Sequence, residues 1–179
     1  MKSSNWNPTW PMTYNYLLTG IRFIALVLVQ VLVFNRMNLF GYVNPMVYVL
    51  FLYWYPVREN RTTLVLAAFL LGFAVDLFSD TMALHTIAAL TTAFLRYPLM
   101  RFVFGVNMEF QNFRLSNSTR VQQFTFLALL VVVHHLVFFA FEIFSLSNLL
   151  LILKRVVLTG LSTFVFSVLL ATLFAIRRE

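Results

Sequence analysis

The strongest constraint on this 179-residue chain is a series of long apolar segments separated by short polar connections. A helix needs about 20 such residues to cross the hydrocarbon core of a bilayer. Six segments follow one another along the chain: Leu17–Phe34, Phe40–Tyr55, Thr62–Phe78, Ala83–Phe104, Val121–Phe144 and Arg155–Ile176. The short stretch Ser147–Leu153 is interpreted as an interfacial turn that leads into the sixth. The pattern predicts an all-α integral membrane protein with about six transmembrane helices.

The composition supports this class. Hydrophobic residues make up 61% of the chain and charged residues 11%, with a mean hydropathy of +0.85. A soluble domain averages about 45–50% apolar and about 25% charged residues, and disorder needs low hydrophobicity and high charge. The length fits one polytopic membrane domain over residues 1–179. Within it, residues 1–16 are either an interfacial segment, as their tryptophans and tyrosines favour, or a disordered tail, and residues 105–120 are the longest loop.

Lysines and arginines near the segment ends predict the orientation, because cytoplasmic loops carry an excess of these residues. With six spans, one side receives nine of them: Lys2, Arg22, Arg58, Arg61, Arg101, Arg114, Arg120, Arg177 and Arg178. The other side receives Arg36, Lys154 and Arg155, while Arg96 lies inside the fourth segment. We therefore expect both termini and the loop 105–120 in the cytoplasm. We therefore interpret the net charge of +7 as a signal for membrane orientation, and we expect no nucleic-acid partner.

Small and polar residues form stripes on the third and fourth segments. In the third segment Ala68, Gly72, Asp76 and Asp80 are spaced by four. In the fourth, His85, Ala89 and Ala93 have the same spacing, and Arg96 follows three residues later. Residues at this spacing share one helix face, and small ones let two membrane helices approach closely. Because the connection between the segments is short, we predict an antiparallel hairpin with these faces opposed.

Asp76 and His85 are expected at similar depth near the periplasmic end of this hairpin. A carboxylate there is costly unless it is paired or hydrated, so one hypothesis is a hydrogen bond between the two side chains. The alternative is an aspartate in the headgroup region and a histidine that packs or caps. Arg96 either pairs with an acid or extends to the cytoplasmic headgroups, and the nearby Pro98 and Arg101 favour the second interpretation.

The pair Asn44-Pro45 precedes most of the second segment. Asparagine is a good helix N-cap, and proline is tolerated in the first helical turn. The pair therefore predicts the start of the second helix, with a ligand site as the alternative.

The sixth segment carries a further stripe at spacing four: Thr159, Thr163, Ser167, Ala171 and Ala175. Such a stripe is typical of tight helix packing in membranes. We expect it to serve packing within the bundle, and a partner helix is the alternative.

Motifs of known enzyme chemistry are not found in the sequence. It has no H-E-x-x-H, no G-x-S-x-G, no Walker A motif and no cysteine. His134 and His135 point about 100° apart on a helix, and no third ligand joins them and Glu142 at short spacing. Asp76 and Asp80 come from one helix end, whereas an aspartyl dyad joins carboxylates of separate elements. We predict a non-enzymatic protein with no catalytic residue, no metal and no cofactor.

The motifs around these polar residues resemble those of MreD, the bacterial rod shape-determining membrane protein. They are Asn44-Pro45-Met46-Val47-Tyr48, Tyr55-Pro56, Gly72-Phe73-Ala74-Val75-Asp76-Leu77-Phe78-Ser79 and Ala83-Leu84-His85. The family pattern is an N-P start of the second helix, G-x-x-x-D-hydrophobic-x-S at the end of the third and G-L-H at the start of the fourth. Ala83 departs from it, because the family often has glycine there.

The resemblance implies a non-enzymatic scaffold of the cell-elongation complex, which supports lateral peptidoglycan synthesis and rod shape in the bacterial cytoplasmic membrane. The implied direct partner is the bitopic MreC, with MreB, RodA and the elongation transpeptidase reached through the complex. The implied fold is similar to the membrane substrate-binding subunits of energy-coupling-factor transporters, with a cavity open to the periplasm near Asp76 and His85. A small-ligand-binding subunit of a transporter is the alternative function. The candidate interaction residues are Asn44, Pro45, Gly72, Asp76, His85 and Arg96.

Overall fold

The structure of the chain, a computed structural model, is built from helices and their connections over its described part. It describes residues 12–37, 39, 43–57, 59–105, 113–143 and 148–175. The α-helices are α1 (Met12–Leu32), α2 (Leu50–Trp54), α3 (Arg61–Ser79), α4 (Leu84–Phe104), α5 (Arg120–Ile143) and α6 (Leu149–Ala175). All except α2 are long and apolar enough to cross a bilayer. The described residues form no strand, only an isolated bridge between Leu39 and Val43. The prediction of an all-α, multi-pass membrane protein is confirmed at this level.

Two helix boundaries differ from the prediction. Helix α1 begins at Met12, so residues 12–16 of the expected interfacial segment belong to the first long helix, and residues 1–11 lie outside the described residues. Helix α6 begins at Leu149, so the expected interfacial turn at 147–153 is wrong from that residue onward. Lys154 and Arg155 do not interrupt the helix, because long basic side chains are good helix formers and extend away from an apolar surface.

The second apolar segment shows the largest difference from the prediction. Among its described residues, 43–55, it is helical only from Val47 to Trp54, as a 3₁₀ turn (η2, Val47–Val49) that continues into α2. At about 1.5–2 Å per residue, these eight residues span only about half of the hydrocarbon core. The expected transmembrane helix over 40–55 is therefore replaced by an irregular stretch and a short helix.

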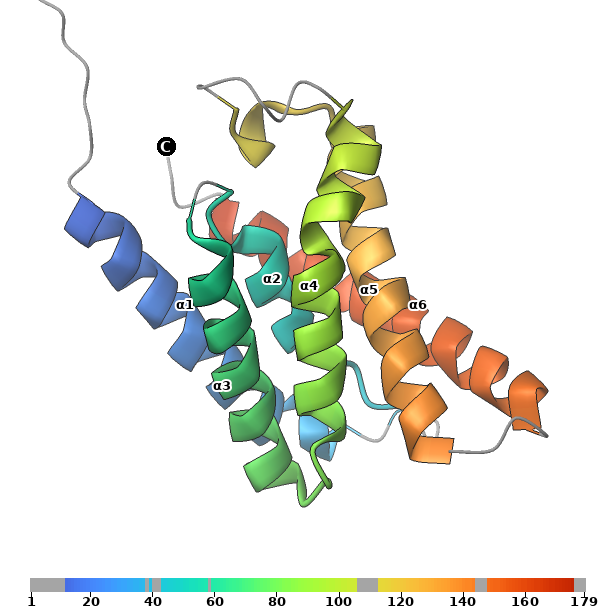
Figure 1. The fold of residues 1–179 in the computed structure, drawn as a ribbon. Coiled ribbons are helices and arrows are strands. Elements are labelled where there is room, and N and C mark those ends of the chain that lie inside the picture. The colour runs from blue at the N-terminus through green and yellow to red at the C-terminus, as the bar shows by residue number, and fades with distance from the viewer. Residues whose placement is uncertain are drawn as a thin grey trace, which may run out of the picture.

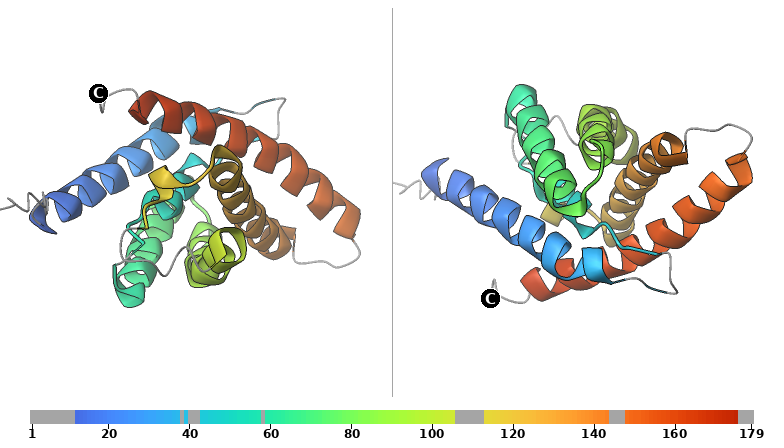
Figure 2. Two further views of the ribbon diagram at one scale, coloured as in Figure 1. Left: turned by 90° about the horizontal axis from the view of Figure 1, so that it is seen from above. Right: turned by 90° about the horizontal axis from the view of Figure 1, so that it is seen from below.

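Helices α3, α4, α5 and α6 run up and down in turn, with α1 beside α3 (Figure 1). We call the end where α3 begins and α4 ends the upper end, and the opposite end the lower end. Helix α1 finishes at the lower end, in the 3₁₀ turn η1 (Phe34–Arg36). The chain therefore reaches the start of α3 by running upward, with α2 in the middle of the bundle, where both end-on views place it (Figure 2).

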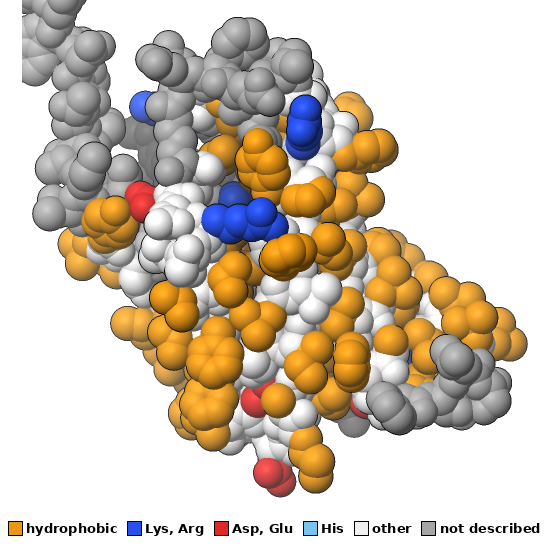
Figure 3. Space-filling view, viewed as in Figure 1, with side chains coloured by type: hydrophobic (Ala, Val, Ile, Leu, Met, Phe, Trp, Pro, Cys, Tyr) orange, Lys and Arg blue, Asp and Glu red, His pale blue; other side chains and the backbone are white. Residues whose placement is uncertain are grey.

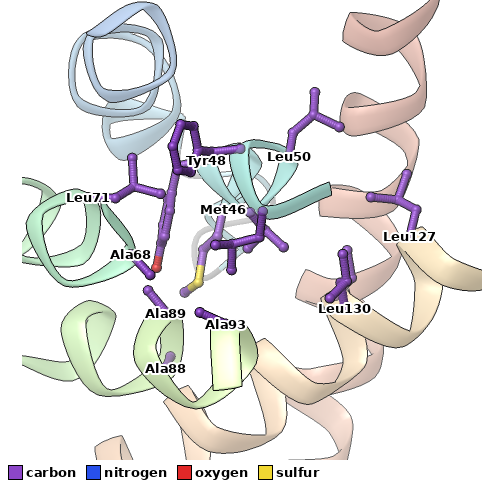
Figure 4. Packing of buried hydrophobic residues seen from close by; sticks show 14 of the residues in the cluster. Met46, Tyr48, Leu50, Ala68, Leu71, Ala88, Ala89, Ala93, Leu127 and Leu130 are labelled. Atoms are coloured by element: carbon purple, nitrogen blue, oxygen red, sulfur yellow. The ribbon is translucent and has the colours of Figure 1, made fainter. Parts of the chain in front are cut away.

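The stretch Met46–Tyr55, which we call the central segment, lies in the core of the molecule. Val47, Tyr48, Val49 and Leu50 are completely buried. Tyr48 lies among side chains of the surrounding helices, with Ala68 and Leu71 of α3 on one side and the α4 alanines beneath, while Leu127 and Leu130 of α5 lie further across (Figure 4). The strongest apolar packing thus surrounds the part of the chain that has the least regular backbone.

Leucine, valine and phenylalanine side chains remain exposed along the outer faces of the long helices. Apolar side chains cover most of the face in Figure 3, and its lysine and arginine side chains lie in the upper part. A surface of this kind suits contact with lipid chains or with other membrane helices, because neither offers polar partners.

Candidate functional site

Asp76 joins the end of α3 to the start of α4. Its carboxylate accepts hydrogen bonds from the backbone N–H groups of His85 (3.0 Å) and Thr86 (2.8 Å) and from the hydroxyls of Thr81 (2.5 Å) and Thr86 (2.6 Å). Only 5% of the residue is exposed. The first N–H groups of a helix have no partner within it, and a negative charge there is favourable. Asp76 therefore caps α4 from a different helix.

The hypothesis of a side-chain bond between Asp76 and His85 is wrong in its details. The two residues do meet, but Asp76 bonds the backbone of His85, while the His85 ring faces Tyr48. The alternative is also wrong about Asp76, because its carboxylate is buried in protein rather than placed among headgroups. Asp80 is exposed and ends α3 in the left-handed conformation (φ 53°), so it takes no part in the Asp76 cluster.

Gly72 brings α3 against α4. A Cβ at this position would lie 2.5 Å from the Thr86 Cα and 2.7 Å from the His85 carbonyl oxygen, so no side chain fits. Ala68 and Ala89, from the two predicted stripes, are completely buried. The prediction that the third and fourth segments form a closely packed antiparallel hairpin is confirmed.

Arg96 holds the upper part of the bundle's central segment to α4. Its guanidinium donates from Nε to the Leu52 carbonyl oxygen (2.6 Å) and from Nη2 to the carbonyl oxygen of Tyr55. Both carbonyls belong to the last turn of α2 or directly follow it, where a helix leaves acceptors unpaired and a positive charge is favourable. The guanidinium carbon also lies about 6 Å from the Tyr55 and Phe126 rings. The expectation that Arg96 extends to the headgroups is wrong, because the residue is only 4% exposed and its guanidinium donates hydrogen bonds within the protein.

Gln30 and Thr163 hold the other end of the central segment. The Gln30 amide nitrogen donates to the Pro45 carbonyl (3.0 Å), and its oxygen accepts from the Tyr48 N–H (3.4 Å). The Thr163 hydroxyl oxygen accepts from the Met46 N–H (2.9 Å). Irregular backbone is tolerated at membrane depth only where the protein supplies hydrogen-bond partners. Residues of α1, α4 and α6 supply them here.

The Tyr48 hydroxyl lies between two histidine rings. It is 2.9 Å from His85 Nδ1 and 2.7 Å from His134 Nε2. With a single proton, the hydroxyl donates to one ring and accepts from the other. All three residues are buried, and His134 Nδ1 has no hydrogen-bond partner within the described part of the chain.

His135 extends this network toward α6. Its Nδ1 faces the Val131 carbonyl oxygen (2.8 Å) and must donate to it, so Nε2 of the neutral ring accepts from the Thr163 hydroxyl (3.0 Å). Glu142 does not join His135 but pairs with Arg155 of α6 (2.7 Å). Among the described residues, no three histidine, cysteine or acidic side chains come together as a metal site would need.

The Asn44-Pro45 pair does not start a helix, contrary to the prediction. Met46 precedes the first 3₁₀ turn, and no side chain caps it. With its amide oriented toward acceptors, the Asn44 nitrogen lies 2.9 Å from the Met37 carbonyl oxygen and 3.2 Å from that of Val43. Pro45 is buried and offers its carbonyl to Gln30. The pair therefore closes the turn before the central segment.

The stripe on α6 faces inward over its described part. Thr159, Thr163 and Ser167 are at most 2% exposed, and Ala171 is half-buried, while the side chain of Ala175 lies outside the described residues. This agrees with packing inside the bundle.

Of the predicted site residues, Gly72 and Asp76 thus lie against the start of α4, and His85 and Arg96 contact the central segment. Pro45 instead contacts Gln30 of α1. The residues that sequence reasoning missed are Gln30 and Tyr48. Gln30 carried a usable signal, because a lone amide inside the apolar stretch 17–34 needs partners. The tyrosine carried none, since Tyr48 is one of several aromatic residues in its segment.

Comparison of the chain with protein-family models, curated proteins and solved structures gave no match. The fold and the network define a polytopic α-helical membrane protein with an interrupted central segment. The resemblance to MreD stays a prediction that rests on the motif residues.

Proposed function

We propose that this chain is a non-enzymatic membrane scaffold of the cell-elongation complex, of the MreD type, which supports lateral peptidoglycan synthesis and rod shape. One observation carries the proposal. The centre of the bundle, where a ligand-binding subunit would hold its ligand, is filled by the chain's own segment, with Val47–Leu50 completely buried. A protein built in this way offers its outer surface for interaction rather than an internal cavity.

The residues that carry the resemblance support the same proposal. Gly72 allows α3 to contact α4, and both carboxylate oxygens of Asp76 accept hydrogen bonds from backbone N–H groups at the start of α4. Their role in this structure is to fix two helices relative to each other. Rigid helix pairs are a suitable surface for another membrane helix, which binds through packing.

The proposed topology has six passages, with both termini in the cytoplasm of a bacterial inner membrane. The central segment supplies the second passage, although it is too short to cross as a helix. The upper end carries Arg61, Arg101, Arg114 and Arg120, and cytoplasmic ends are rich in such residues. Lys2, Arg58, Arg177 and Arg178, which the orientation also uses, lie outside the described residues.

The proposed direct partner is the single membrane helix of an MreC-type protein, and MreB, RodA and the elongation transpeptidase would be reached through it. The bundle exposes continuous apolar faces for such a helix, for example Leu161, Val165 and Leu169 of α6.

A small-ligand-binding subunit with a fold like that of energy-coupling-factor transporters is the second candidate. Its support is the unpartnered nitrogen of His134 in the core, and the filled centre argues against it. A separate ATPase would also be needed, because the chain has no Walker A motif.

Co-purification tests the proposal. The tagged full chain is co-expressed with the MreC-type protein of the same bacterium, extracted in mild detergent and captured, with an unrelated single-span protein as the control. We expect retention of the MreC-type protein alone, and loss of rod shape when the chain is depleted. Failure to retain it would refute the scaffold proposal, and capture of an ATPase instead would favour the transporter subunit.

A further inference from the structure

A cavity of about 210 Å³ lies at the upper end of the bundle, between the end of α4 and the start of α5. The chain between these helices includes the 3₁₀ turn η4 (Leu115–Asn117). One side of the cavity is apolar, formed by Phe104 and Phe113, whose rings lie 5.3 Å apart. The other side is polar and includes Arg114, Asn117, Thr119 and Gln122. The cavity thus offers apolar and polar surfaces to one molecule.

Two groups on the polar side have no partner among the described residues. Thr119 and Gln122 form hydrogen bonds with each other, so the Thr119 hydroxyl and the Gln122 side-chain oxygen already have partners. The exposed Arg114 guanidinium forms no hydrogen bond or ion pair with any described residue, and the Asn117 amide nitrogen forms none either. A guanidinium with five donors suits phosphate, which it can bind through two parallel bonds.

Two further arginines lie close to the cavity in the chain. Arg101 is in the last turn of α4, three residues before Phe104, and Arg120 is the first residue of α5. Both are exposed, and their guanidinium groups have no ion pair within the described part of the chain. In contrast, Arg155 at the lower end is paired with Glu142. The three arginines at and near the cavity therefore have no acidic partner among the described residues.

The cavity lies beside the ends of the exposed apolar faces of α4 and α5. The last turn of α4 and the first turn of α5 expose Phe102 (79%) and Val121 (73%), which marks the beginning of the lipid-facing surface. Positive side chains in the upper part of the face and apolar side chains below them are visible in Figure 3. A molecule with an anionic headgroup and hydrocarbon chains would match the positive surface and the apolar surface below it.

We propose that the cavity binds the phosphodiester headgroup of an anionic phospholipid, with Arg114 as the main phosphate contact. Arg101 and Arg120 add attraction, and Asn117 adds a neutral donor. The site requires only that the chain lies in a membrane, so its test is independent of the proposed scaffold function.

The test measures lipid binding to the full chain in detergent by native mass spectrometry, with phosphatidylglycerol and phosphatidylcholine as probes. The variant is Arg114→Gln, and the matched control is Arg36→Gln, which removes an exposed arginine at the lower end. One basic residue near an anionic surface contributes about 1 kcal/mol, so Arg114→Gln should weaken phosphatidylglycerol binding about fivefold. Phosphatidylcholine binding and the Arg36→Gln control should stay at the wild-type level.

Three results would overturn the proposal. Unchanged phosphatidylglycerol affinity in Arg114→Gln would exclude the cavity, and an equal loss in Arg36→Gln would show general attraction to basic residues. A competition with inorganic phosphate separates lipid from free phosphate, and full displacement of the lipid would also contradict the proposal. Asn117→Ala serves as a second variant, with a smaller expected loss, and unchanged melting temperatures exclude misfolding as the cause.

Discussion

Replacement of Asp76 by asparagine removes one of two carboxylate oxygens that each accept two hydrogen bonds. One oxygen accepts from the Thr81 hydroxyl and the His85 N–H, and the other accepts from the Thr86 N–H and the Thr86 hydroxyl. Whichever oxygen becomes the NH₂ group, one backbone N–H loses its acceptor. The corresponding hydroxyl can rotate and accept from the new NH₂ group instead.

The expected cost follows from this geometry. A buried N–H without a partner costs about 1–3 kcal/mol, and the bonds that remain lose the strengthening that a charged acceptor gives. The favourable interaction of a carboxylate with the helix start, worth about 0.3–1 kcal/mol, is lost as well. Together these effects predict a loss of about 2–4 kcal/mol of stability for Asp76→Asn. For a chain of this length that corresponds to a decrease of about 5–15 °C in Tm.

Thermal unfolding in mild detergent, followed by size-exclusion fluorescence, measures this difference. Asp80→Asn is the matched control, because it makes the same chemical change at an exposed residue, and asparagine also tolerates the left-handed conformation. The control should stay within about 0.5 kcal/mol of the wild type. Equal Tm values for the two variants would refute the claim that Asp76 holds α4 in place.

Two further substitutions test the helix hairpin and the central segment. Gly72→Ala should destabilise the protein by at least about 1–3 kcal/mol, since its Cβ would meet the backbone of α4, whereas Gly20→Ala, with open space around it, should raise stability by about 0.5–1 kcal/mol. Similar Tm changes for both would contradict the close contact. Arg96→Met should cost about 2–4 kcal/mol because it leaves two buried carbonyls without a donor, and Arg101→Met, at an exposed position, should have almost no effect on Tm.

The long helices were predictable because each depends on its own sequence. Apolar length and the short connection after Ser79 suffice to place α3 and α4 as a hairpin, and the small residues identify the faces that meet. The contact at Gly72 was predictable for a similar reason. The sequence shows that this position has no side chain, and this allows a neighbouring helix to approach closely.

The central segment was not predictable because distant residues stabilise it. Met46 depends on Thr163, and Leu52 depends on Arg96. Apolar composition alone predicts a membrane helix at 40–55, since it does not show that other helices supply the hydrogen bonds. The same lack of information makes Arg96 look like a headgroup anchor, because the sequence does not reveal where free carbonyls lie.

The wide sequence separation of these bonds has a consequence for the way the protein is made. Met46 is synthesised 117 residues before Thr163, and Leu52 is synthesised 44 residues before Arg96. Until α4 and α6 have emerged from the ribosome, the backbone of the central segment lacks these two partners and would be costly to transfer into lipid. The insertion machinery must therefore keep this stretch near water or protein while the rest of the chain is translated. The last helix supplies the hydrogen-bond partner of Met46, so a chain truncated before α6 should leave the start of the central segment less well held.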